Sequence, residues 1–190
     1  MKKVKVILLI ALVILLPFSK NAGQRMGDMS IVCAMGIDVE KGEYTVTLQY
    51  LNLYKGTGKS DGITGNITAL AHGKADSIDK AIDNIQQTLP DVLFFGQNEL
   101  IVIGAKTEKD VLLDYLKTSR YVRNDIMLAR SQTTAREVVD NSLRGAVVPA
   151  NSLVKQLKEG SRSVSVNDLL RDGTLKLPEV MPYSKYCTVL

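Results

Sequence analysis

The sequence predicts an α+β fold, a mixed α/β arrangement in which helices pack against a mixed β-sheet. Residues 93–104 read LFFGQNELIVIG, and the β-branched run Glu99–Ile103 ends at Gly104. A short apolar run bounded by turn residues is typical of a buried strand. One helical pattern precedes this run and another comes after it. We therefore expect a central strand that neighbouring helices cover.

The first two strands are predicted to form a β-hairpin. The run Met29–Ile37 is apolar throughout, and Asp38–Gly42 has turn chemistry, with Gly42 suited to a positive φ. In Glu43–Leu51, apolar side chains alternate with Thr and Gln. This alternation predicts a strand with one face exposed to water.

A third strand and a helix are expected next. The strand is Asn66–Lys74, and it contains His72, which is the one histidine of the chain. A single histidine without a partner motif favours a surface or packing role over a base. Apolar residues at helical spacing predict a helix that Asp76 caps, that runs to about Leu89 and that Pro90 stops.

The elements after the central strand have equally clear signals. Thr107 is expected to cap a helix, and Arg120–Asp125 is expected to be an exposed polar turn. Ile126–Arg130 predicts another short strand. Thr134 with Glu137 three residues later has the pattern of a capping box, which predicts the start of a short helix.

Proline and glycine punctuate the last part of the chain. We expect short helices in Ser152–Lys158 and in Ser165–Arg171, where Ser165 is the cap, and an extended segment in Leu175–Pro182. The final residues, Cys187–Leu190, have the composition of a strand that has only begun. This pattern favours a chain that is cut short.

Residues 1–22 predict a signal peptide or a membrane anchor on the extracytoplasmic side. Lysines precede an apolar run, Val6–Phe18, whose length suits a signal peptide better than a spanning helix. Possible cleavage sites carry an unsuitable residue at the −3 position, so an uncleaved anchor stays open. No cysteine lies near Ser19, so the sequence has no lipobox and no predicted lipidation site.

The expected organisation has two further parts: an N-terminal α/β domain in residues 23–145, and a linker with the start of another domain in residues 146–190.

The formal net charge is +4, but residues 1–22 hold four lysines and no acidic residue. Without these four, the 24 basic residues fall to 20, which equals the number of acidic residues. A neutral body argues against nucleic acid as a partner.

No pattern in the sequence predicts catalysis, a cofactor or a metal. Asp76, Asp79 and Asp83 lie at helical spacing near a predicted helix start, where solvated acids are expected rather than a catalytic pair. The loop Lys55–Gly65 contains Gly-Thr-Gly-Lys-Ser, but its glycine spacing does not match a phosphate-binding loop, and no helical pattern comes after it. A binding module is therefore favoured over an enzyme.

The two cysteines, Cys33 and Cys187, do not form a disulfide framework. Cys33 lies in a predicted strand and is interpreted as a small buried apolar residue. Pairing between the two remains open for a chain outside the cytoplasm.

Three segments carry a resemblance to a known family. Met35–Asp38 followed by Gly42–Thr47 resembles the opening hairpin of the C subunits of bacterial spore germinant receptors, the Ger(x)C type. Leu93–Gly96 with Glu99–Gly104 resembles their central segment, and Leu112–Arg130 is similar to the next helix and strand of these proteins. The motif residues to which this resemblance assigns a structural role are Gly36, Asp38, Phe95, Gly96 and Gly104.

The resemblance implies a non-enzymatic subunit of a nutrient germinant receptor at the outer face of the inner spore membrane. It implies membrane-spanning A- and B-type subunits as partners, a complex that senses a small-molecule nutrient, and no cofactor. A different class of function also fits the residues: a membrane-tethered extracytoplasmic binding or envelope-assembly module unrelated to spores.

Overall fold

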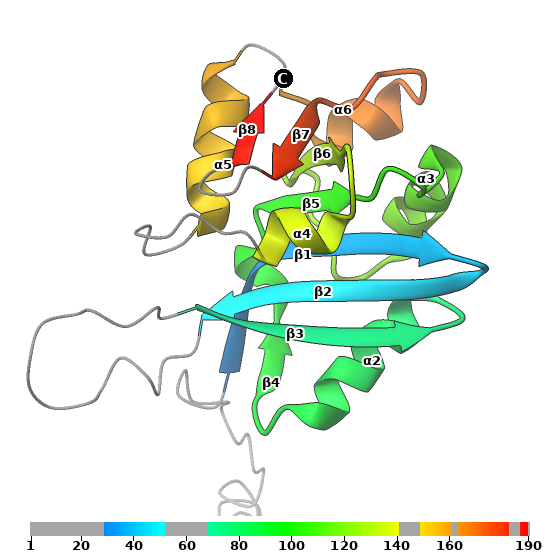
Figure 1. Cartoon of the computed structure of the whole chain (residues 1–190), viewed down its shortest axis with the longest axis vertical. Helices are drawn as coiled ribbons and strands as arrows, with labels where there is room; N and C mark the ends of the chain where they lie inside the picture. The colour runs from blue at the N-terminus through cyan, green and yellow to red at the C-terminus, as the bar shows by residue number, and fades with distance from the viewer. Residues whose placement is uncertain (1–28, 52–67, 141–148, 161–162, 183–186, 190) are drawn as a thin grey trace, which may run out of the picture.

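The structure is a computed structural model that describes residues 29–51, 68–140, 149–160, 163–182 and 187–189 (Figure 1). These residues form one eight-stranded sheet with helices on both of its faces. The strands are β1 (Met29–Glu40), β2 (Glu43–Leu51), β3 (Thr68–Ala75), β4 (Val92–Phe94), β5 (Leu100–Ile103), β6 (Met127–Ser131), β7 (Glu179–Pro182) and β8 (Cys187–Val189). The helices are α2 (Ile78–Thr88), α3 (Lys109–Thr118), α4 (Ala135–Asp140), α5 (Pro149–Glu159), α6 (Val166–Arg171) and the 3-10 turn η4 (Phe95–Gln97).

The sheet is mixed, as the sequence predicts. Its strand order is β3-β2-β1-β5-β6-β7-β8, and β4 pairs with the beginning of β1. β1, β2 and β3 form an antiparallel meander, whereas β1, β5, β6 and β7 run parallel to one another. The predicted α+β class is therefore confirmed.

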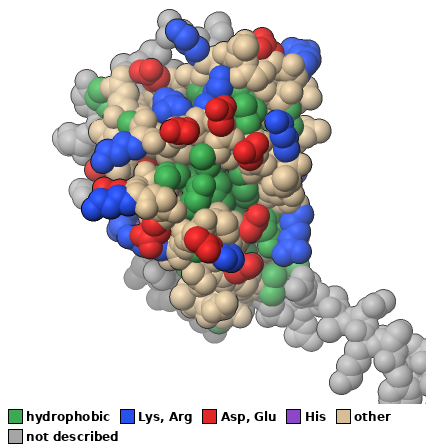
Figure 2. All heavy atoms as spheres, turned by 90° about the vertical axis from the view of Figure 1, so that its right-hand side faces the viewer, with side chains coloured by type: hydrophobic (Ala, Val, Ile, Leu, Met, Phe, Trp, Pro, Cys, Tyr) green, Lys and Arg blue, Asp and Glu red, His purple; other side chains and the backbone are tan. Residues whose placement is uncertain are grey.

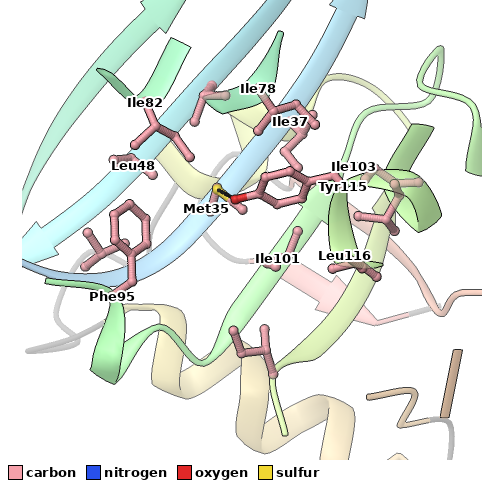
Figure 3. Packing of buried hydrophobic residues seen from close by; sticks show 14 of the residues in the cluster. Met35, Ile37, Leu48, Ile78, Ile82, Phe95, Ile101, Ile103, Tyr115 and Leu116 are labelled. Carbon is pink, nitrogen blue, oxygen red and sulfur yellow. Dashed lines mark hydrogen bonds between the residues drawn. The ribbon is translucent and has the colours of Figure 1, made fainter. Parts of the chain in front are cut away.

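Two hydrophobic cores lie on opposite faces of the sheet, because successive side chains of a strand point to opposite sides. In β5, Ile101 and Ile103 belong to the first core, whereas Leu100 and Val102 belong to the second. Helices α2, α3 and α6 contribute to the first core, and α4 and α5 contribute to the second. Figure 3 shows part of the first core, where the Tyr115 hydroxyl on α3 points at the Met35 sulfur, 3.9 Å away.

The predicted hairpin is present, but its turn is shorter than expected. β2 has the predicted bounds, whereas β1 continues to Glu40, so the turn is Lys41 and Gly42 alone. Both turn residues have positive φ, 53° and 82°, as a tight two-residue hairpin turn requires. The prediction of a turn beginning at Asp38 was wrong, because Asp38 still pairs with Thr45 in the ladder.

The prediction that one face of β2 is exposed to water was wrong. Thr47 is fully buried and Gln49 is 2% exposed, because α4 and α5 cover this face. The Gln49 amide is satisfied there: its Nε2 donates to the carbonyl of Val139 at 3.1 Å, and its Oε1 accepts from the amide of Ala150 at 3.2 Å. A polar side chain thus ties both helices of the second core to the sheet.

Two predicted helix caps lie elsewhere. α2 is capped by Ser77, whose Oγ accepts from the amide of Lys80 at 3.4 Å, while Asp76 pairs with the Lys80 ammonium. Thr107 does not cap α3; its hydroxyl donates to the carbonyl of Ile37 at 3.2 Å, and Glu108 is the residue before the helix. Hydroxyl and carboxylate side chains can both cap a helix N-terminus. Where they occupy adjacent positions, the sequence alone does not show which of the two is the cap.

Other local predictions are confirmed. Ser165 caps α6 in a full capping box with Asp168. At the start of α4, Thr134 accepts from the amide of Glu137 at 3.2 Å, which is the Thr134 half of the predicted capping box. The strand β4 has no counterpart among the predicted elements, because three residues are too few to show a periodicity.

The sheet continues past residue 145, near which we predicted a domain boundary. β7 pairs with β6, and the side chains of α5 pack in the second core with residues of β1. The predicted signal or anchor segment, the Lys55–Gly65 loop and the end of the Thr134 helix after Asp140 lie outside the described residues. None of the helices in the described ranges has both the length and the apolar character needed to cross a membrane.

Cys33 sits at an irregularity in β1, where the pairing with β2 shifts between Val32 and Ala34. The thiol is free and 5% exposed, so the interpretation as a small buried residue is confirmed. Burial, with a smaller contribution from the charge of Glu99, raises the pKa of the Cys33 thiol to about 11.

We expect Cys33 to react slowly with thiol reagents in the folded chain. At about pH 8 its thiolate fraction is about 100-fold lower than that of an ordinary cysteine, and burial restricts access further. The measurement is the rate of iodoacetamide labelling in Cys187→Ser, which leaves Cys33 as the single thiol. Unfolding in urea should restore an ordinary rate; equally fast labelling of the folded chain would contradict the burial of this thiol.

Candidate functional site

Three of the five motif residues come together where β1 and β5 end beside the start of α4. Gly36 and Asp38 lie in β1, and Gly104 directly follows β5. Asp38 accepts a hydrogen bond from the amide of Ala135, the first residue of α4, and a Cβ atom on either glycine would lie within 3.4 Å of Ala135. We call Gly36, Asp38, Gly104 and Ala135 the Asp38 cluster.

The Asp38 carboxylate caps α4 from a distant part of the sequence. Its Oδ1 accepts from the amide of Ala135 at 2.7 Å, and its Oδ2 accepts from the amide of Arg136 at 2.9 Å. The first amides of a helix have no partner within the helix, and the positive end of the helix dipole favours an anion. Asp38 therefore orients α4 on the sheet, together with the local cap from Thr134.

The two glycines make room for this cap. A Cβ atom on Gly104 would lie 2.0 Å from Asp38 Oδ1, a distance that no side chain can occupy while the carboxylate stays in place. A Cβ on Gly36 would lie 3.2 Å from the Cβ and backbone of Ala135, which is a tight contact. Glycine at both positions lets α4 approach the sheet closely.

Backbone contacts fix the end of β5 beside the cluster. The carbonyl of Ile37 accepts from the amide of Gly104 at 2.9 Å and from the hydroxyl of Thr107 at 3.2 Å. The amide of Ala105 donates to the carbonyl of Thr133 at 2.8 Å, immediately before α4. The Asp38 cluster thus joins β1, β5 and α4 into one unit.

The other two motif residues, Phe95 and Gly96, lie apart from the Asp38 cluster, in η4 between β4 and β5. The Phe95 ring is 7% exposed and lies 4.7 Å from the ring of Tyr121, centroid to centroid. The carbonyl of Gly96 accepts a hydrogen bond from the Arg123 guanidinium, and the ring of Phe94 occupies the space where a Gly96 side chain would be. These contacts hold η4 against the segment after α3.

The segment Arg120–Asp125 is only partly exposed, in contrast to the prediction. Arg120 and Asp125 are exposed, whereas Tyr121 is half-buried against Phe95. Arg123 donates to both carboxylate oxygens of Asp125, at 2.9 and 2.8 Å. These bonds hold the pKa of the Asp125 carboxyl below its ordinary value.

A cleft of about 270 Å³ opens between α2 and the end of α3. Asp79 and Asp83 of α2 face Arg120, whose guanidinium lies 5.0 Å above the Tyr121 ring and donates to its hydroxyl at 2.8 Å. This hydrogen bond and the nearby carboxylates raise the pKa of Arg120. The predicted solvated acids are thus exposed as expected, and they share their surroundings with a basic side chain.

The surface elsewhere combines apolar and charged groups. Figure 2 views the side of the molecule that carries α3 and the β1–β2 turn, and it shows an apolar patch in the middle of that face. Acidic and basic side chains alternate around the patch. A surface of this kind suits protein contacts, because an apolar centre with a polar rim is the usual anatomy of an interface.

His72 and Cys33 are of residue types that can act as a base or a nucleophile, but here both make structural contacts. His72 Nδ1 lies 3.1 Å from the hydroxyl of Thr47, and partial burial, with the charge of Arg136, lowers the pKa of its ring. Cys33 is protonated at neutral pH, as its raised pKa requires. Within the described residues, no group of three His, Cys, Asp or Glu side chains is placed to hold a metal ion.

The motif residues could be recognised in the sequence, but the contacts that they make could not be predicted from it. Asp38 and Ala135 are 97 positions apart, and the partners of Asp38 are backbone amides, which carry no residue-type signal. Thr107 was predicted to cap a helix, whereas its hydroxyl donates to the carbonyl of Ile37. Only the juxtaposition of β1, β5 and α4 in the fold shows why these positions are glycine and aspartate.

We expect Asp38→Ala to destabilise the fold by about 1–2 kcal/mol, since two helix amides lose their acceptor. Glu40→Ala is the matched control on the same strand: Glu40 is exposed, and its nearest basic partner, the Lys106 ammonium, is 3.9 Å away. The measurement is urea unfolding followed by circular dichroism. Equal unfolding midpoints for the two variants would show that the Asp38 cap contributes nothing.

Gly104→Ala should cost about 1–3 kcal/mol through steric conflict with the Asp38 carboxylate, and the cost should shrink in an Asp38→Ala background. Gly96→Ala is the control, because its nearest atoms belong to the tip of the exposed Phe94 ring, which can rotate away. A double-mutant cycle of unfolding free energies measures the coupling. Strict additivity of Gly104→Ala and Asp38→Ala would refute the contact.

Comparison with known proteins gives one match. A sequence model of the family described as "Spore germination protein N-terminal domain" matches residues 23–172, which is most of the chain. Neither curated proteins nor solved structures gave a match. The matched range contains β1 to β6, α2 to α6 and all five motif residues. The chain belongs to the Ger(x)C family of spore germination proteins, and residues 23–172 correspond to the N-terminal domain of that family.

Proposed function

We propose that this protein is a non-enzymatic subunit of a nutrient germinant receptor, attached to the outer face of the inner spore membrane. In this role it assembles with membrane-spanning A- and B-type subunits, and the complex senses a small-molecule nutrient. Family membership over residues 23–172 is the observation that carries the proposal.

The chemistry of the motif residues supports a scaffold role. Asp38 uses both carboxylate oxygens on backbone amides, and Gly36 and Gly104 serve close packing. Phe95 packs on Tyr121, and the carbonyl of Gly96 accepts from Arg123. Each motif position therefore acts on the shape of the domain, which is what a subunit that presents surfaces to partners requires.

Two surfaces are available for such partners. One is the cleft between α2 and α3, where Asp79, Asp83 and Arg120 offer both charges. The other is the apolar patch with its charged rim in Figure 2. Mixed charge around an apolar centre favours a protein partner, because complementary charges set the orientation of docking.

The test is a pull-down of the tagged full chain from isolated inner membranes of spores, with mass spectrometry of the recovered proteins. We expect A- and B-type subunits to be recovered. Asp38→Ala should reduce recovery as far as it unfolds the domain, whereas Glu40→Ala should leave recovery unchanged. Recovery of the folded chain alone, or synthesis of the protein in vegetative cells and not in the forespore, would overturn the proposal and favour a tethered module unrelated to spores.

A further inference from the structure

β4 exposes two large apolar side chains next to each other on one face of the sheet. Val92 is 43% exposed and Phe94 is 42% exposed, whereas Leu93 between them is buried in the first core. Among the described residues, Leu170 on α6 is the other large apolar side chain with comparable exposure, at 36%. Adjacent apolar side chains exposed to water in this way indicate a surface that binds a protein or a membrane.

The exposed pair lies beside the first residues of β1. The parallel register places Val92 opposite Met29 and Phe94 opposite Ile31, so these four side chains share one face. On the other side of β1, Leu51 pairs with Ile31 and extends the same apolar face toward the second core. Figure 1 shows β4 at the lower end of the molecule and α6 near the upper end.

Along the sequence, an apolar segment precedes β1 by a short stretch of chain. Val6–Phe18 is separated from Met29 by ten residues, 19–28. Ten residues span at most about 35 Å when fully extended, whereas β1 alone is about 40 Å long. A membrane that holds Val6–Phe18 is therefore nearest to the end of the sheet that carries β4.

We propose that Val92 and Phe94 rest on the lipid surface of the membrane to which the chain is attached. The inference rests on the membrane attachment in the proposed function. Two apolar side chains on a short strand can enter the boundary between headgroups and acyl chains, where apolar burial is favourable and the strand backbone stays near water. The connecting segment contains the basic residues Lys20 and Arg25 and one acidic residue, Asp28, and this small basic excess suits a surface with anionic lipids.

The chain contains no tryptophan, so a single introduced tryptophan reports on its own surroundings. The test variants are Phe94→Trp and Val92→Trp, and the matched control is Leu170→Trp, an exposed apolar site on α6. The full chain is synthesised in the presence of vesicles of equal parts phosphatidylcholine and phosphatidylglycerol, with or without bromine on the acyl chains. Flotation of the vesicles reports attachment, and bromine quenching reports contact of the tryptophan with lipid.

We expect each β4 variant to float with the vesicles and to lose much more of its emission to brominated lipid than Leu170→Trp does. Using two β4 positions keeps the test valid if one variant fails to fold. Flotation with equal, weak quenching at all three positions overturns the lipid contact alone. Emission that shifts to the blue without any effect of bromine also overturns it, and assigns the face to a protein partner or a second copy. A chain that does not float overturns the membrane attachment, and the inference with it.

Discussion

The Asp38 carboxylate is the constraint on which the arrangement of this domain depends. It lies on the interior strand β1, and it accepts hydrogen bonds from the first two amides of α4. The first amides of a helix have no acceptor within the helix, and the positive end of the helix dipole favours an anion. The cap from Asp38 therefore determines where α4 lies, and α4 in turn covers Gln49 and the second core.

The same constraint explains why glycine occupies two positions around Asp38. Helix and sheet can approach closely at Gly36, and the carboxylate fits beside Gly104. A comparable contact occurs on the opposite face, where a Cβ on Gly73 would lie 2.1 Å from the carbonyl of Ala81 in α2. At Gly36 and at Gly73 the absence of a side chain therefore lets one helix on each face approach the sheet closely.

Much of the fold could be predicted from the sequence, because strands such as Glu43–Leu51 and Leu100–Ile103 carry strong local patterns. The covered face of β2 could not, since Thr47 and Gln49 are polar and are satisfied only by partners distant in sequence. Nor could β4 or the irregularity at Cys33, which changes the side that β1 residues face without changing their apolar character. At the site, residue types were recognisable, but the backbone groups that they bind were not.

The position of β1 in the sheet has a consequence for how the chain folds. β1 comes first among the described strands, yet it lies in the middle, between β2 and the later strand β5. The hairpin with β2 can form from neighbouring residues, whereas the other edge of β1 must wait until Leu100–Ile103 is available. Pairings between distant segments slow folding, because the intervening loop must close before the contacts form. During synthesis from the N-terminus, this edge of β1 therefore lacks its β5 partner until about half of the chain has been made.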